Sequence, residues 1–157
     1  MCKYALLSLF FLIFVTGCDN QRLFEEKADF ENMTWPIGAP ATFEFDISDT
    51  DLSYNLYVSI RNSIDYPFHN LYLMHQLQDP EGAVISKSLN NIILFDPKTG
   101  RPEGKGVGTT RDLQKLLMSD QKFEKSGKYK IRLDQYMRPD VLLGVASVGI
   151  RVEKVDG

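Results

Sequence analysis

The chain has 157 residues, with 18 basic and 21 acidic side chains that give a formal net charge of −3. It contains no block of basic residues, no Gly-Arg stretch and no base-stacking motif, so we expect no nucleic-acid partner. The length fits a single domain that can bury a sizeable core, and such a domain needs neither a metal nor a disulfide to hold it together.

The first twenty residues have the order of a bacterial export signal. Lys3 precedes an apolar run, residues 5–15, that is broken only by Ser8. Crossing a bilayer takes about twenty residues, so this run is too short for a membrane span and fits the core of a signal peptide. Residues 15–18 (Val-Thr-Gly-Cys) then match a lipobox, in which small residues admit the signal peptidase and the thiol accepts a diacylglyceryl group. The alternative is an ordinary signal peptide with an incidental cysteine.

The lipobox predicts that residues 1–17 are removed. Cys18 then becomes an S-diacylglycerol, N-acyl cysteine that anchors the protein to a membrane of the cell envelope, because more than one acyl chain gives stable attachment. Cys2 leaves with the signal, so the processed chain keeps neither a free thiol nor a possible disulfide. These residues leave open which membrane and which leaflet hold the anchor.

Residues 18–35 are predicted to be a tether, because they are mostly polar and charged. Its aromatic residues, among them Phe24 and Phe30, are able to dock on the folded body. Trp35-Pro36 predicts the start of that body, since a residue before proline is held in extended geometry. The folded domain is therefore expected over residues 36–157.

The rest of the chain alternates apolar and polar residues, which is typical of strands with one buried face. Asp79-Pro80-Glu81-Gly82 and residues 96–100 have turn chemistry between such runs. The residues Leu113, Leu116 and Leu117 fit either a short helix or an irregular strand. The expected strands are residues 42–47, 55–61, 71–77, 83–89, 92–95, 129–134, 142–146 and 148–153.

This pattern predicts an all-β protein. About seven to nine short antiparallel strands with frequent turns favour an antiparallel β-sandwich, Ig-like or jelly-roll-like, with a barrel as the alternative.

Little in the sequence points to catalysis or to metal binding. Only His69 and His75 could serve as a histidine base, and His75 shares a strand face with leucines, which favours a place at the edge of the core. No acidic or cysteine ligand stands at metal-binding spacing from them. The glycine-rich residues 104–108 place Lys105 wrongly for a phosphate loop and more simply allow a bulge or a close strand approach. We therefore expect no catalytic residue, no metal, no cofactor and no small-molecule substrate.

Two further groups of residues have competing interpretations. The carboxylate pairs, Glu25-Glu26 and Asp49 with Asp51, lie in the tether and in a turn, where solvated charge explains them. The tyrosines Tyr57 and Tyr72 lie on strand faces opposite the aliphatic stripes. They form either an exposed interaction surface or a second face that other segments cover.

Several segments of the chain resemble a known family. They are residues 54–62 (YNLYVSIRN), 65–73 (DYPFHNLYL), 127–131 (GKYKI), Met137-Arg138 and 143–153 (LGVASVGIRVE). Together with the lipobox they resemble the GldH gliding motility lipoprotein family of the Bacteroidetes, from the signal to the end of the chain. The resemblance implies a cell-envelope lipoprotein that is linked to gliding and to type IX secretion. It carries over Cys18 as a functional residue and no catalytic residue.

These observations lead to one main hypothesis, in which the protein is a noncatalytic envelope component that binds other proteins of the gliding or secretion machinery. The alternative is a carbohydrate-binding surface lipoprotein with Tyr57 and Tyr72 as its aromatic platform. An enzyme is the third hypothesis, and it would require a histidine in a polar cleft with carboxylate partners.

Overall fold

A computed structural model describes residues 20–155, which form ten β-strands and one short 3-10 helix. The elements are β1 Arg22–Asp29, η1 Glu31–Met33, β2 Thr34–Pro36, β3 Ala41–Ile47, β4 Ser53–Ser63, β5 Asn70–Gln78, β6 Val84–Ile93, β7 Thr110–Lys122, β8 Gly127–Gln135, β9 Val141–Leu143 and β10 Val145–Val155.

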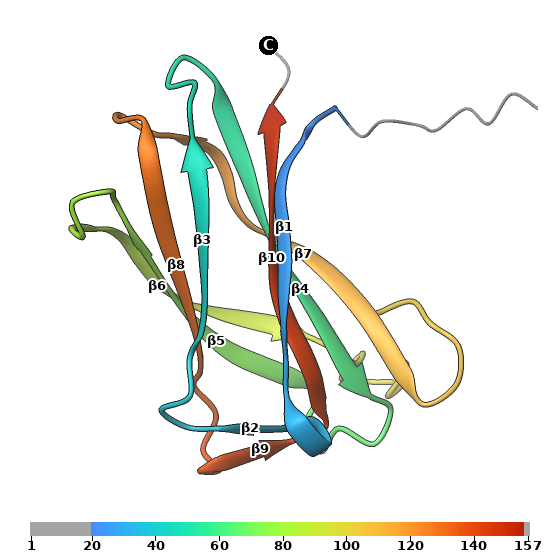
Figure 1. The fold of residues 1–157 in the computed structure, drawn as a ribbon. Coiled ribbons are helices and arrows are strands. Elements are labelled where there is room, and N and C mark those ends of the chain that lie inside the picture. Colours follow the sequence, from blue (N-terminus) through green and yellow to red (C-terminus); the bar gives the residue numbers. More distant parts are fainter. Residues whose placement is uncertain (1–19, 156–157) are drawn as a thin grey trace, which may run out of the picture.

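Two four-stranded antiparallel sheets face each other in a sandwich (Figure 1). One sheet, which we call sheet A, has the order β1-β10-β4-β7, and the other, sheet C, has the order β3-β8-β5-β6. The short pair β2-β9 runs across the foot of both sheets. The predicted β-sandwich is confirmed, and the barrel alternative is wrong because neither large sheet closes on itself among the described residues.

The alternation of the sequence explains why these segments are strands. In β3 every second side chain is buried, and β4 and β8 repeat the same pattern. Successive residues of a strand point to opposite faces, so one face of each sheet supplies the core and the other remains outside. Each fully buried aliphatic or aromatic side chain stabilises the fold by about 1.5–3 kcal/mol relative to an exposed one.

Aromatic rings from both sheets fill one end of the core. Phe123 lies 4.4 Å from the ring of Tyr129 and 5.5 Å from that of Tyr54. Phe45 of sheet C lies 5.9 Å from Phe24 of β1. Offset and edge-on ring pairs of this kind add to the stabilisation that burial alone provides.

The segment expected to be a tether differs from that prediction, because most of it belongs to the fold. Strand β1 pairs antiparallel with β10 from Arg22 to Asp29, and β2 pairs with β9. Trp35 is fully buried, stacks on Phe30 at 4.6 Å and donates its indole N–H to the carbonyl of Ala39 at 2.7 Å. The folded body therefore begins at Arg22 and not at residue 36.

The ambiguous leucines lie in a strand, not in a helix. Tyr57 of β4 pairs with Leu116 of β7, whereas the adjacent Leu56 pairs with Met118, so Leu117 has no partner of its own. Such a β-bulge inserts one residue and shifts the faces of the strand. The bulge explains why apolar residues recur at intervals of three and one in this segment.

Candidate functional site

The predicted lipidation site, Cys18, lies outside the described residues, as do the signal peptide and the cleavage position. Within residues 20–155, no helix is long and apolar enough to cross a membrane. Cys18 stands four residues before Arg22, where β1 begins. A chain of that length reaches at most about 14 Å.

The structure separates the two tyrosines that were proposed as one surface. Tyr57 belongs to β4 of sheet A, where its neighbours Leu56 and Val58 are buried. Tyr72 belongs to β5 of sheet C, again between buried leucines, and 40% of its surface is exposed. Because the core lies between the sheets, the two rings point out of opposite faces of the sandwich. They cannot form a single aromatic platform for a glycan.

His75 is buried, as its position among leucines predicts, and it has polar partners. Its Nε2 lies 3.1 Å from Oγ of Ser86, and its Nδ1 lies 2.9 Å from the side-chain amide nitrogen of Asn90. A serine, a histidine and an amide in this order resemble the arrangement of a nucleophilic hydrolase. The directions of the hydrogen bonds decide whether the resemblance has chemical meaning.

The Asn90 amide fixes the protonation of the ring. The same nitrogen lies 3.2 Å from the carbonyl of Leu73 and 3.1 Å from that of Ser88, and a carbonyl only accepts hydrogen bonds. The nitrogen is therefore the donor, and Nδ1 of His75 accepts from it. In the neutral ring Nε2 then carries the proton and donates it to Ser86. A general base would need Nε2 unprotonated, so this cluster does not activate the serine.

Burial lowers the pKa of His75 below its ordinary value of 6.5. The shift agrees with a neutral ring that is held by one donated and one accepted hydrogen bond. No carboxylate takes part in these bonds. The enzyme hypothesis requires a histidine with carboxylate partners, and His75 does not meet this requirement.

His69 does not join His75 in a site. Its carbonyl accepts the backbone N–H groups of Leu94 and Phe95, each at 2.9 Å, so this residue fastens the end of β6 to the start of β5. Among residues 20–155, no three His, Cys, Asp or Glu side chains come together in a way that could hold a metal ion.

The acidic pairs serve local structure. Asp49 accepts the backbone N–H of Asp51 at 3.0 Å, and its carbonyl accepts the hydroxyl of Tyr54 at 2.7 Å, which fixes the turn between β3 and β4. Glu25 forms ion pairs with Arg22 at 3.0 Å and with Arg151 at 3.1 Å on the outer face of sheet A.

The glycine-rich stretch brings two backbones close together, as its composition predicts. Lys105 and Asp112 exchange two backbone hydrogen bonds of 2.8 and 2.7 Å. A Cβ atom on Gly104 would lie 2.8 Å from the carbonyl oxygen of Asp112, and one on Gly106 would lie 2.6 Å from that of Thr110. Glycine is therefore required at this crossing because a side chain does not fit.

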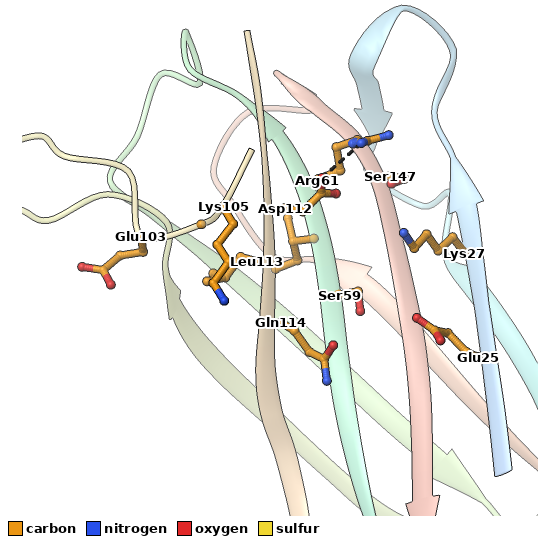
Figure 2. A pocket seen from close by; sticks show the side chains of 12 residues that line it. Glu25, Lys27, Ser59, Arg61, Glu103, Lys105, Asp112, Leu113, Gln114 and Ser147 are labelled. Carbon is orange, nitrogen blue, oxygen red and sulfur yellow. Dashed lines mark hydrogen bonds and ion pairs between the residues drawn. The ribbon is translucent and has the colours of Figure 1, made fainter. Parts of the chain in front are cut away.

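A cavity of about 520 Å³ opens on the outer face of sheet A beside this crossing (Figure 2). Its floor consists of the small residues Ser59 and Ser147, which leave space between longer side chains. Three cations and three carboxylates line it, so the charges favour neither an anionic nor a cationic ligand. Arg61 pairs with Asp112 at 3.1 Å, and Figure 2 marks this ion pair with a dashed line. The charged lining residues are Glu25, Lys27, Arg61, Glu103, Lys105 and Asp112.

The sequence interpretation missed this cavity. The available signal is the row of small residues at alternate positions of two strands, with Ser147 and Gly149 in β10 and Ser59 in β4. These small residues indicate a cavity only when it is known that Gly149 pairs with Ser59 and Ser147 with Arg61. The single sequence does not specify this pairing.

The folded body matches one protein family over nearly its whole length. The family model of the GldH lipoproteins covers residues 22–152. The chain belongs to the GldH lipoprotein family. The match begins at β1, so the family pattern includes the strand that the sequence interpretation had assigned to a tether.

Two relatives support this assignment over more than nine tenths of the chain. The gliding motility lipoprotein GldH homolog of Christiangramia forsetii is 33% identical over an alignment of 157 positions that covers 94% of this chain and 93% of the relative. The gliding motility lipoprotein GldH of Flavobacterium johnsoniae is 29% identical over 151 residues and covers 92% of each chain. The resemblance to this family is confirmed.

Similarity to solved structures is weaker. The infectious bursal disease virus VP2 subviral particle has a TM-score of 0.43 at 12% identity, and this chain spans 86% of its own length but 33% of that chain. Latent dimeric PorU from Porphyromonas gingivalis has a TM-score of 0.33 at 7% identity, with 85% of this chain and 13% of that one covered. These values carry no conclusion about function.

Proposed function

We propose that this GldH family member is a membrane-anchored lipoprotein of the cell envelope that acts by binding other proteins of the gliding motility and type IX secretion-associated machinery, without catalysis. Cys18 is its lipidated residue. Membership of the GldH family from β1 to β10 is the observation that carries the proposal.

The geometry of the candidate residues supports a binding role rather than a chemical one. The Ser86-His75-Asn90 cluster holds its proton on the wrong nitrogen for a general base. The wide cavity of sheet A has balanced charges and small residues at its floor. The carbohydrate-binding alternative loses its argument, because Tyr57 and Tyr72 lie on opposite faces.

A clean deletion tests the role in the cell. In a gliding host we expect the deletion strain to lose spreading on agar, and plasmid-borne wild-type protein to restore it. Secretion is assayed in parallel by the amount of secreted protein in the culture medium. Normal spreading together with normal secretion in the deletion strain would refute the proposed function.

The anchor is tested separately. A Cys18→Ser protein should keep its signal peptide, fail to incorporate labelled palmitate and fail to restore spreading. Cys2→Ser is the matched control, because Cys2 leaves with the signal and its loss should change none of these readouts. Membrane fractionation of the wild-type protein then identifies the membrane. Full activity of the Cys18→Ser protein would show that anchoring at Cys18 is not required.

A further inference from the structure

The sandwich has four edge strands, and the two on one side cover each other. Strands β1 and β3 are adjacent edges of the two sheets, and Phe24 packs on Phe45 between them. Strand β1 also carries charged residues at Arg22, Glu25, Glu26, Lys27 and Asp29. Charges on an edge strand discourage the pairing of another chain.

The other side of the sandwich has two edges of different kinds. The outer edge of strand β7 is not free along its whole length. Lys105 pairs with Asp112 near the start of the strand, and a bulge distorts the edge at Leu117. Strand β6 has no further strand on its outer edge among the described residues, and its bulge lies at Ile85, near its start, which leaves residues 86–93 regular. It runs ten residues from Val84 to Ile93 without proline, and Lys87 is its one charged residue.

Strand β6 also exposes apolar side chains. Val84 is 50% exposed, and Ile85 and Leu89 are each 45% exposed. A long edge with exposed apolar residues and a single charge is the kind of edge to which another strand adds.

The register of the sheet shows which backbone groups of β6 are available. The N–H of Tyr136 donates to the carbonyl of Tyr72, so Tyr72 directs its backbone toward β8. In an antiparallel strand alternate residues bond to opposite neighbours, so the next residue, Leu73, bonds to β6 at Asn90. Lys87, Leu89 and Asn91 therefore direct their N–H and C=O groups away from the sheet.

A groove lies next to this free edge. It has a volume of about 430 Å³ and separates β6 from β7, with residues 89–93 on one wall and 115–117 on the other. Lys115 is the one charged residue among those that line it. Within the described chain, neither Lys87 nor Lys115 has an ion-pair partner.

We propose that the outer edge of β6 binds an extended strand of a partner protein, in which apolar residues alternate with polar ones and one carboxylate on each face meets a lysine, Lys87 on the outer face of sheet C and Lys115 in the groove. The partner adds a fifth strand to sheet C and places side chains in the groove beside β7. Charge favours this occupant over a second copy, because β6 itself carries a lysine and no carboxylate that could pair with Lys87 or Lys115. The inference names the surface for the partner binding proposed above and rests on that function.

Binding is measured on the purified full-length lipoprotein in detergent with synthetic probes. One labelled peptide of ten residues alternates valine and threonine and has one glutamate at a threonine position and one at a valine position, so that the two carboxylates point to opposite faces. A second peptide has lysine at the same positions. By fluorescence anisotropy we expect the glutamate peptide to bind about tenfold more tightly, as two favourable ion pairs replace two repulsive contacts. Methylation of its alternate backbone nitrogens should abolish binding. Equal affinity of the two peptides overturns the proposal.

Variants of the protein locate the site. Leu89→Glu places a negative charge beside Lys87 without touching the bonds between β5 and β6, and its repulsion of the peptide carboxylates should weaken the glutamate peptide about tenfold or more. Leu143→Glu is the matched control, since Leu143 is a 57% exposed leucine on β9. Circular dichroism confirms that both variants fold. Unchanged affinity of Leu89→Glu, or dimers of the chain alone that this variant dissociates, overturns the proposal.

Spreading assays separate this inference from the proposed function. If Leu89→Glu fails to restore the deletion strain while Leu143→Glu restores it, the β6 edge is the required surface. If the deletion abolishes spreading and both variants restore it, the inference about β6 is refuted and the proposed function stands. If the deletion strain spreads and secretes normally, the proposed function itself fails, whatever the peptides bind.

Discussion

Replacing Trp35 with alanine tests whether the N-terminal segment is part of the folded body. The indole is fully buried, stacks on Phe30 and donates to the carbonyl of Ala39. Removing a buried tryptophan side chain costs about 3–5 kcal/mol, from lost transfer energy and from the cavity left behind. A domain of this size has about 5–15 kcal/mol of stability in total. The variant should therefore lose about a fifth or more of its free energy of unfolding.

The loss is measured by guanidinium denaturation of the full-length lipoprotein in detergent, followed by far-ultraviolet circular dichroism. Fluorescence does not serve here, because Trp35 is the sole tryptophan of the sequence. The melting temperature should fall by roughly 10–20 °C. Tyr136→Ala is the control, since Tyr136 is 59% exposed and its loss should cost less than about 0.5 kcal/mol. A change below about 1 kcal/mol in Trp35→Ala would refute the docking of residues 22–36.

Two further substitutions test the interior. Because burial lowers the pKa of His75, the unfolded chain binds more protons below the ordinary value of 6.5, and wild-type stability should fall as the pH drops from 7.5 to 5. In denaturation series at several pH values, His75→Gln should lose the part of this pH dependence of stability that His75 causes, whereas His69→Gln should keep it. An unchanged pH dependence in His75→Gln would contradict the burial of a neutral His75. A Cβ atom on Gly149 would lie 2.5 Å from the carbonyl oxygen of Glu26, so Gly149→Val should displace β1 and cost about 1–3 kcal/mol. Ser59→Val, on the paired position of β4, should be nearly neutral in the same denaturation assay, and equal costs would argue against this close approach.

The strands with one buried face follow from the sequence because the signal is local. Phe43, Phe45 and Ile47 alternate with polar residues, and the structure buries all three. The signal fails where a strand departs from period two. The bulge in β7 leaves Leu117 unpaired, so that its leucines have the spacing of a helix although they lie in a strand.

Strand β1 escaped prediction for another reason. Its outer face is charged, and Glu25 is satisfied by Arg151, a residue that is 126 positions away. An edge strand that pairs with the last strand of the chain has no local turn to reveal it. The separation of Tyr57 from Tyr72 was unpredictable for the same reason. Their strands, β4 and β5, belong to different sheets, and neither segment alone indicates with which strand it pairs.

The pairing of β1 with β10 has a mechanical consequence. A pull on the chain ahead of Arg22, directed along the strand and away from the domain, acts perpendicular to the hydrogen bonds between Arg22 and Asp29 and their partners on β10. Such a load is shared by the whole row of bonds at once, in shear, and does not open them one after another. The pairing of β1 with β10 can therefore transmit tension from the N-terminal end to the sandwich. The force that it withstands depends on the rate of unfolding under load.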